Sequence, residues 1–526
     1  MNHDKTDLIL SLVNSKLQNK YQRYMQSLWM TLTSNNEKWV NQLEKDEKSY
    51  NKELSSPYLV QQINKLNREK YINRYHKRQV VSIYNEMLEL SLNPTLQEKY
   101  TELWNEMHYR IATNTTEYNG KQIRETEVLR LLEVEEDIIK RKGLWFKYMS
   151  LGSKLSEGLL DLVNMRNVIA KEKGFNNFYE LKLASQGLSS KELKSIIHHL
   201  RSSLDEDYRK IKENIDYQIK QQYGINDNSI RPWHYSHPFF QEYKLSYFKE
   251  SDLSVDNILY KLKSWFNESG IDISGILKNS DISDNRHKSE ANFCLNIDRE
   301  KDVRISSNYH QNQKSLSLLM HELGHAVYEH NIRPGLPFIL KKSSEIFMSE
   351  AIAIFFERLV YKKSWYCSVI SGENAHTDAF VNRQDFIQNF LVKLYWTITL
   401  TTFEEELYSN PNQDLNDLWW SIVSDVQKID RPPDCHIPVW AVKAHLTTLP
   451  VYYHNYLLGE VISSQLSTIL ERKFGFSDSH SSIQFLKENL FAYGNSLSWR
   501  DLLLKSFQGY LNPQYLISDI KRTLGG

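Results

Sequence analysis

Helix-breaking residues are scarce along the whole chain, and this scarcity limits the possible fold more than any other feature. The 526 residues include only 12 prolines and 18 glycines, the two residue types that most disfavour a helix interior. From the start to about residue 225, apolar residues recur at spacings of three and four, as in LLDLVNMRNVIAKEKG. This is the period of an amphipathic helix. The sequence therefore predicts a mainly α fold built from several long antiparallel helices.

The charge balance and the cysteine content limit which partners this chain can have and in which compartment it works. Lysine plus arginine equals aspartate plus glutamate, 65 against 65, so nothing draws the whole chain to nucleic acid or to an anionic membrane. We find no secretion signal and no apolar run near the roughly 18 residues of a membrane span. The cysteines Cys294, Cys367 and Cys435 are widely spaced and do not form a disulfide pattern. We expect a cytoplasmic protein without nucleic-acid or membrane partners, of unknown oligomeric state.

Turn-forming and aromatic residues interrupt the helical pattern at residues 224–240, in GINDNSIRPWHYSHPFF. We expect a crossover between two lobes of one integrated body here. Residues 1–240 would form a helical N-terminal lobe, and residues 241–526 a catalytic lobe. Further on, the alternating runs ANFCLNI (291–297) and DVRISSNY (302–309) predict an antiparallel hairpin, the one sheet expected in the chain.

The segment HELGH at residues 321–325 has the HExxH pattern, in which two histidines one helical turn apart bind zinc and the glutamate acts as the base of a metallopeptidase. A predicted helix capped by Ser315 surrounds it. Its apolar face carries Leu316, Leu319, Met320, Leu323 and Val327. His321, Glu322 and His325 fall on the opposite face. We therefore expect two zinc ligands, His321 and His325, and a catalytic base, Glu322.

A catalytic zinc needs a third protein ligand, and the sequence offers it downstream. The segment SSEIFMSEAIAIFFERLV predicts a helix that is apolar nearly all round, where a carboxylate needs a partner. Glu350 and Glu357 are seven residues apart and share a face, whereas Glu345 projects elsewhere. We expect Glu350 to be the third ligand and Glu357 to orient a ligand from the outer shell. Glu345 is the next alternative as ligand.

These segments resemble the gluzincin oligopeptidases, specifically the thimet oligopeptidase and oligoendopeptidase F group, with relatives in angiotensin-converting enzyme and the Thermus-type carboxypeptidases. The resemblance lies in SEANFC (289–294), HELGHAVYEH (321–330), SEAIAIFFE (349–357) and HLTTLPVYYHNYLLGE (445–460), and DVRISSNY is close to the carboxypeptidase relatives. It implies a two-lobed helical shell around a deep channel, with one zinc ion per chain and a small sheet beside the active-site helix. It also implies short peptides as substrates.

The resemblance further implies how the reaction is assisted. A downstream histidine and tyrosines stabilise the carbonyl oxygen in such enzymes, and we transfer this role to His445 and Tyr456, with Tyr453 next and Tyr452 as its alternative. The strand before the metal helix often pairs with the substrate backbone, which makes Asn292, Phe293 and Cys294 candidates for that contact.

Three functions remain open at this point. The first is an endopeptidase that cleaves short unstructured peptides with Glu322 as general base. The second is a C-terminal exopeptidase, either a carboxypeptidase or a peptidyl-dipeptidase. The third is an inactive peptide-binding pseudoenzyme, against which the intact Glu322 argues, because loss of that base is the simplest route to inactivity.

Overall fold

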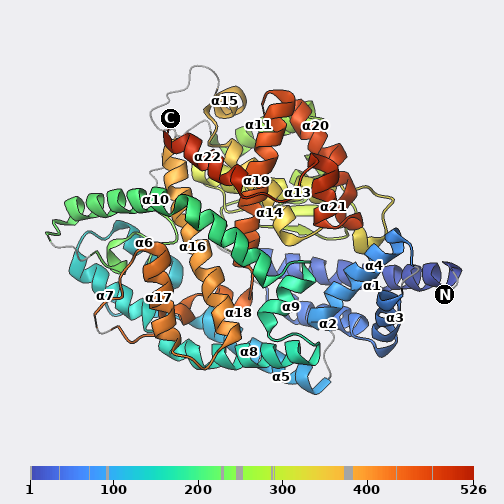
Figure 1. The fold of residues 1–526 in the computed structure, drawn as a ribbon, viewed down its shortest axis with the longest axis horizontal. Coiled ribbons are helices and arrows are strands. Elements are labelled where there is room, and N and C mark those ends of the chain that lie inside the picture. Colours follow the sequence, from blue (N-terminus) through green and yellow to red (C-terminus); the bar gives the residue numbers. More distant parts are fainter. Residues whose placement is uncertain are drawn as a thin grey trace. The chain divides into compact units, whose positions relative to one another are not determined.

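The computed structural model of the chain describes residues 3–525 apart from 35, 70–71, 91–93, 227–229, 244–252, 286–287, 290, 372–382, 434 and 477. The described part is mostly helical with two small antiparallel sheets, which confirms the predicted fold class (Figure 1). It divides into two compact units. Unit 1 contains residues 1–91, 246–383 and 458–522, and unit 2 contains residues 92–245, 384–457 and 523–526. The expected division into lobes at residue 240 stays a prediction.

Unit 1 begins with four helices, drawn in blue in Figure 1. They are α1 (His3–Thr33), α2 (Glu37–Leu54), α3 (Pro57–Arg68) and α4 (Arg74–Leu90). Their apolar faces share a core that includes Leu17, Leu54 and Ile63, all fully buried. The short segment η3 (Phe338–Leu340) inserts into the same core. This contact joins the N-terminal helices to the chain that leads into α14.

The rest of unit 1 carries the predicted metal motif. Its elements are α11 (Val255–Glu268), α12 (Ser274–Asn279), β3 (Phe293–Asn296), β4 (Val303–Ser306), α13 (Gln313–His330), α14 (Ile346–Leu359), α15 (Lys363–Trp365), η4 (Tyr366–Ser371), α20 (His480–Asn489), η7 (Phe491–Ser496), α21 (Trp499–Phe507) and α22 (Gln514–Gly525). Helix α19 (Tyr453–Phe474) starts in unit 2 and belongs to unit 1 from Leu458 onward.

Unit 2 is built almost wholly of helices. They are α5 (Pro94–Thr113), α6 (Glu125–Val134), α7 (Ile138–Met149), α8 (Gly152–Glu172), α9 (Phe178–Ser185), α10 (Ser190–Tyr223), η1 (Pro232–His234), α16 (Arg383–Ser409), α17 (Leu415–Gln427), η6 (Val439–Val442) and α18 (His445–Thr448). No described helix in either unit is long and apolar enough to cross a membrane.

Unit 2 also contains a hairpin that the sequence analysis missed. Strands β1 (Thr116–Tyr118) and β2 (Lys121–Ile123) pair through a turn at Asn119 and Gly120, whose φ angles are 50° and 77°. An Asn-Gly pair with positive φ at both residues is typical of a tight two-residue hairpin turn. The flanking residues lack a clear apolar alternation, so the turn dipeptide was the only signal.

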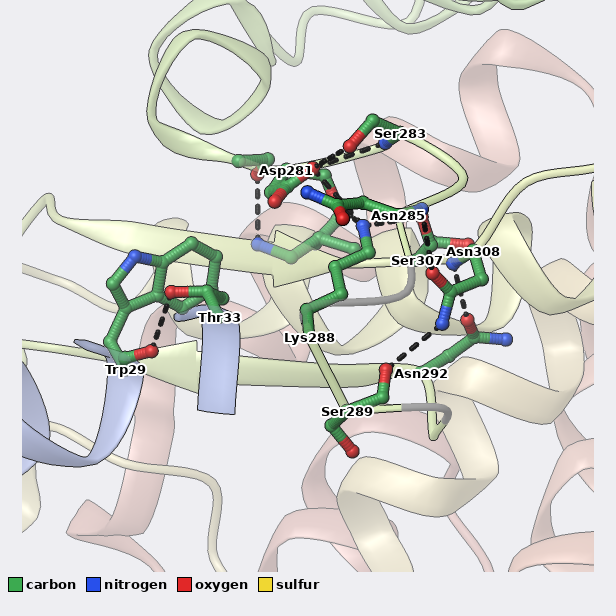
Figure 2. A network of polar contacts seen from close by, with 12 residues as sticks. Trp29, Thr33, Asp281, Ser283, Asn285, Lys288, Ser289, Asn292, Ser307 and Asn308 are labelled. Carbon is green, nitrogen blue, oxygen red and sulfur yellow. Dashed lines mark hydrogen bonds and ion pairs between the residues drawn. The ribbon is translucent and has the colours of Figure 1, made fainter. Parts of the chain in front are cut away.

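The expected hairpin forms, although each strand is shorter than its predicted run. Strands β3 and β4 are antiparallel, with Phe293 opposite Ser306 and Asn296 opposite Val303. A buried lysine ties β4 to the preceding loop: Lys288 Nζ donates to Asp281 O, Asp281 Oδ1 and Ser307 O, each at 3.0 Å (Figure 2). The network fixes the sheet beside α13.

Candidate metal centre

Helix α13 presents two unlike faces. Its five predicted core residues, Leu316, Leu319, Met320, Leu323 and Val327, are all completely buried. The helix begins earlier than expected, because the cap is Asn312, whose side chain accepts a hydrogen bond from Ser315 N. The predicted cap at Ser315 is therefore wrong: this residue lies in the first turn. The apolar face anchors the helix, and the opposite face carries His321, Glu322 and His325.

Two imidazoles and one carboxylate come together between α13 and α14. Nε2 of His321 lies 3.6 Å from Oε2 of Glu350, and Nε2 of His325 lies 4.0 Å from the same oxygen. The three groups offer one ligand atom each within 4.8 Å of one another, and no other such group is found among the described residues. Two imidazole nitrogens and a carboxylate oxygen, with a further position for water, form a donor set of catalytic zinc. The residues present thus fit this metal.

The remaining ring nitrogens of the two histidines have their own partners. Nδ1 of His321 lies 2.9 Å from Oε2 of Glu357, and Nδ1 of His325 lies 2.8 Å from Oγ of Ser349. Contacts of this kind fix the ring orientation and leave Nε2 for the metal. Glu357 was predicted from the sequence, whereas the role of Ser349 was not, although Ser349 directly precedes Glu350 in the motif SEAIAIFFE.

Glu345, the alternative ligand, is not in this group. Its carboxylate Oε1 lies 3.7 Å from Nη2 of Arg78 on α4, and burial, partly offset by Arg78, raises its pKa to about 7. Glu350 instead lies in a tight space: a Cβ placed on Gly459 of α19 would lie 2.9 Å from Cβ of Glu350. This close approach leaves no room for a side chain at residue 459 and lets α19 pack directly against α14 at Glu350.

Glu322 is 8% exposed and lies next to His321 in the sequence. Burial, opposed by the charge of His321 and supported by the negative charges of Glu350 and Glu357, raises the pKa of this carboxyl to about 7. A carboxyl whose pKa lies near neutrality suits a group that takes up and returns a proton.

Strand β3 lies between α1 and α13. Phe293 packs edge-on against Trp29 of α1, with ring centroids 5.8 Å apart. On the other side Asn296 Nδ2 donates to Glu329 of α13 at 3.0 Å. The pKa of Cys294 is raised well above its usual value by burial and, to a smaller extent, by the charges of Glu322 and Glu329. Successive strand residues thus alternate between the two helices.

The edges of the sheet differ. Among the described residues β3 pairs only with β4, whereas β4 also bridges to Asp281 on its outer side. Asn292, just before β3, accepts a hydrogen bond from Asn308 N at 3.1 Å, while Asn308 Nδ2 donates to Ser289 O (Figure 2). Of the three predicted substrate-strand residues, Asn292 supports the hairpin, Phe293 faces α1, and Cys294 faces α13.

The predicted histidine and tyrosines lie together in unit 2. The rings of His445 and Tyr453 are 5.1 Å apart, and those of Tyr453 and Tyr456 are 5.7 Å apart. Tyr453 is only 6% exposed, whereas Tyr452 and Tyr456 are half-buried and one turn apart. Burial and, to a smaller extent, Lys443 lower the pKa of His445 to about 4, so this imidazole is neutral at pH 7.

Residues 277–393 match the family described as Carboxypeptidase Taq (M32) metallopeptidase. The matched stretch contains the hairpin and all residues of the group formed by His321, His325 and Glu350. No curated protein matches the chain. The match supports the expected relation to zinc peptidases at the level of their carboxypeptidase relatives. Together with a donor set that fits zinc, it makes the chain a zinc-dependent metallopeptidase, a hydrolase that acts on peptide bonds.

Proposed function

We propose that the chain is a carboxypeptidase that removes residues from the free C-terminus of short, unstructured peptides. One observation carries this choice over the endopeptidase: the family that matches residues 277–393 is described as a carboxypeptidase, and the match spans the whole metal group. The expected endopeptidase activity then becomes the alternative. It rests on the resemblance of several segments to the oligopeptidases.

We assign the metal ligands to His321, His325 and Glu350, with one zinc ion per chain. The distances from Glu350 Oε2 to both Nε2 atoms support this assignment. Glu357 holds His321 through Nδ1, and Ser349 holds His325 in the same way. When bound, zinc activates a water molecule and polarises the scissile carbonyl.

Glu322 is the proposed general base. It takes a proton from the attacking water and returns it to the leaving amine. Glu322 lies beside the ligand His321 on α13 and is 8% exposed. His445 and Tyr456 are the proposed donors to the carbonyl oxygen. Neutral imidazole and phenol groups each carry one proton that can be donated to that oxygen.

The substrate backbone is proposed to pair with β3. Its partner β4 occupies one edge of this strand, and β4 itself is bounded on its outer side by Asp281. An extended peptide can therefore add to the sheet at the β3 edge, which has no second strand among the described residues. The network of Lys288 and Asn308 holds the hairpin in place for this contact.

Two matched peptides test the proposal. One internally quenched peptide has a free C-terminal carboxylate, and its twin has an amidated C-terminus. We expect the zinc-loaded protein to shorten only the free form, with single residues released in mass spectra. Cleavage of both peptides at internal bonds would establish the endopeptidase instead. Release of dipeptides would indicate a peptidyl-dipeptidase, and no cleavage of either peptide would indicate a pseudoenzyme.

We further propose a reducing compartment, the cytoplasm, as the site of action. Cys294, Cys367 and Cys435 are all free thiols in the structure. Purification under non-reducing conditions, followed by mass measurement after alkylation, tests this directly. Three alkylated thiols are expected, and a disulfide in protein taken from its natural source would contradict it.

A further inference from the structure

The turn between His445 and Tyr456 contains a strained residue. Val451 has a φ angle of 56° and is 1% exposed. In this left-handed region the Cβ of an ordinary residue crowds the next carbonyl, and a β-branched side chain makes the conformation rare. Such a conformation persists only where surrounding contacts impose it, and it is found most often near functional sites.

Two buried ionisable side chains hold this turn, one near each end. Glu404 of α16 is 2% exposed and accepts a hydrogen bond from Val451 N at 2.7 Å. Arg166 of α8 is completely buried and donates through Nη1 to Leu446 O at 2.9 Å. Its Nη2 donates to Thr447 O at 2.6 Å. Both side chains thus direct hydrogen bonds at the main chain of residues 446–451.

Burying such groups is unfavourable unless their hydrogen bonds are satisfied. Burial raises the pKa of Glu404 to about 8, although the Val451 N–H and the charge of Arg166 act to lower it. The carboxyl therefore serves Val451 as a hydrogen-bond acceptor without needing a charge. An amide of the same shape can take its place, and this property makes the contact testable.

The turn decides how two predicted catalytic side chains lie relative to each other. His445 opens α18 on one side of it, and Tyr456 lies in the first turn of α19 on the other side. The start of α19 is held independently by His454, which is 1% exposed and whose Nε2 lies 2.9 Å from Oε1 of Gln186. A change in the backbone of residues 446–451 would consequently move His445 with respect to Tyr456.

We propose that Arg166 and Glu404 are positioning residues: Arg166 holds the end of α18 and Glu404 holds the strained Val451, and together, as a clamp, they set the placement of His445 and Tyr456. This inference rests on the proposed function, in which those two side chains donate to the carbonyl oxygen. A positioning role predicts that weakening the clamp lowers turnover, while metal and substrate binding persist.

Three variants test the clamp by steady-state kinetics of the zinc-loaded protein. Glu404→Met removes the acceptor at similar volume, and we expect kcat to fall about 10- to 100-fold with KM and zinc content nearly unchanged. Glu404→Gln keeps an oxygen that can accept the hydrogen bond from Val451 N. We expect kcat to stay within about threefold of the wild-type value, because the contact does not need a charged acceptor. Adding Val451→Gly to Glu404→Met should restore part of the lost kcat, because glycine adopts positive φ without strain. Glu406→Met, two residues along the same helix and half-buried, is the matched control.

Hydrogen exchange of the amides of residues 446–456 in the same proteins gives a readout that needs no activity. We expect exchange to become about tenfold faster in Glu404→Met, as local opening becomes easier, and slower again in the double variant. Normal kcat in Glu404→Met, or unchanged exchange there, would overturn the proposal. If the wild-type protein cleaves no peptide, the proposed function fails, and the exchange data still show whether the clamp exists.

Discussion

Gly324 of α13 lies directly against the backbone of α14 at Ala353. A Cβ placed on Gly324 would lie 2.6 Å from Ala353 Cα and 3.0 Å from Ile352 O. Side-chain atoms do not approach a backbone so closely, and backbone atoms cannot move aside without shifting the helix. The glycine in HELGH therefore sets the distance between the helix with the two imidazoles and the helix with the carboxylate.

Replacing Gly324 by alanine should separate the two helices. We expect Gly324→Ala to lower the free energy of unfolding by about 1–3 kcal/mol, the usual effect of overpacking. Zinc affinity should fall as well, because His325 and Glu350 move apart. Denaturant unfolding and competition with a chelator measure the two effects. Gly143→Ala in α7 is the matched control, since nothing lies within 4 Å of its added Cβ; equal zinc affinity in both variants would contradict the prediction.

Removing the charge on Glu357 should weaken the metal site without touching a ligand. The carboxylate lies 2.9 Å from His321 Nδ1. Its negative charge makes the imidazole a stronger ligand for the metal through Nε2. We expect Glu357→Gln to reduce zinc affinity about 10- to 100-fold, as for other groups that support metal ligands. Ser349→Ala should have a smaller effect, because a neutral hydroxyl is lost. A zinc competition assay ranks the variants, and the exposed Glu213→Gln on α10 should match the wild-type protein.

Glu322→Gln tests the general base. Glutamine fills the same space but cannot take up a proton, so we expect turnover to fall about 10²- to 10⁴-fold with zinc still bound. Peptide cleavage and zinc content are measured on the same preparation. Near-normal cleavage by a zinc-loaded Glu322→Gln protein would show that another group accepts the proton.

Local periodicity explains why the sequence analysis reached the core of the metal site. The faces of α13 follow from spacing along one helix, and the five apolar residues predicted for its buried face are all completely buried. Spacing along one helix likewise predicts that Glu350 and Glu357, seven residues apart, share one face of α14. Helix ends were less certain, because Asn312 and Ser315 are equally good capping residues and only the structure shows which one accepts the hydrogen bond.

Contacts between segments far apart in the chain leave no periodic pattern in the sequence. The pairing of His325 with Ser349 depends on how α13 packs against α14, and a serine in an apolar helix suggests nothing by itself. Arg166 and Leu446 lie 280 residues apart in the sequence and meet only in the folded chain. Periodicity identifies the buried face of a helix but not the partner that covers it, which explains these omissions.

The exposure of the tyrosines predicts which of them donates to the carbonyl oxygen of the substrate. Tyr453 is 6% exposed and packs against His445, whereas Tyr456 is half-buried. We expect Tyr456→Phe to lower kcat by about 10²-fold, the usual effect of losing one such donor, with zinc content unchanged. Tyr453→Phe should lower kcat less and should mainly affect stability. Equal kcat in wild type and Tyr456→Phe would remove Tyr456 from the reaction, and Tyr452 would then be tested.

A buried ionic cluster should make the stability of unit 1 depend on pH. Glu86 of α4 accepts hydrogen bonds from Tyr50 at 2.9 Å and from Lys342, and Arg299 Nη2 lies 3.4 Å away. Burial alone would raise the pKa of Glu86, but Lys342 and Arg299 outweigh it and lower the pKa to about 2 from its ordinary 4.5. The folded state thus favours the charged carboxylate. Its stabilisation is fully present above pH 4.5 and is lost as the pH falls toward 2.

Glu86→Gln should therefore be less stable than the wild-type protein at pH 6 by on the order of 3 kcal/mol, since one pKa unit corresponds to about 1.4 kcal/mol. The difference should shrink steadily between about pH 4.5 and pH 2, because the carboxyl of the unfolded wild-type chain takes up a proton over this range while the folded carboxyl stays ionised down to about pH 2. Urea unfolding of both proteins at several pH values measures it, with Glu488→Gln on the exposed face of α20 as control. A difference that stays constant across this range would mean that Glu86 acts through packing and neutral hydrogen bonds, without contribution from its charge.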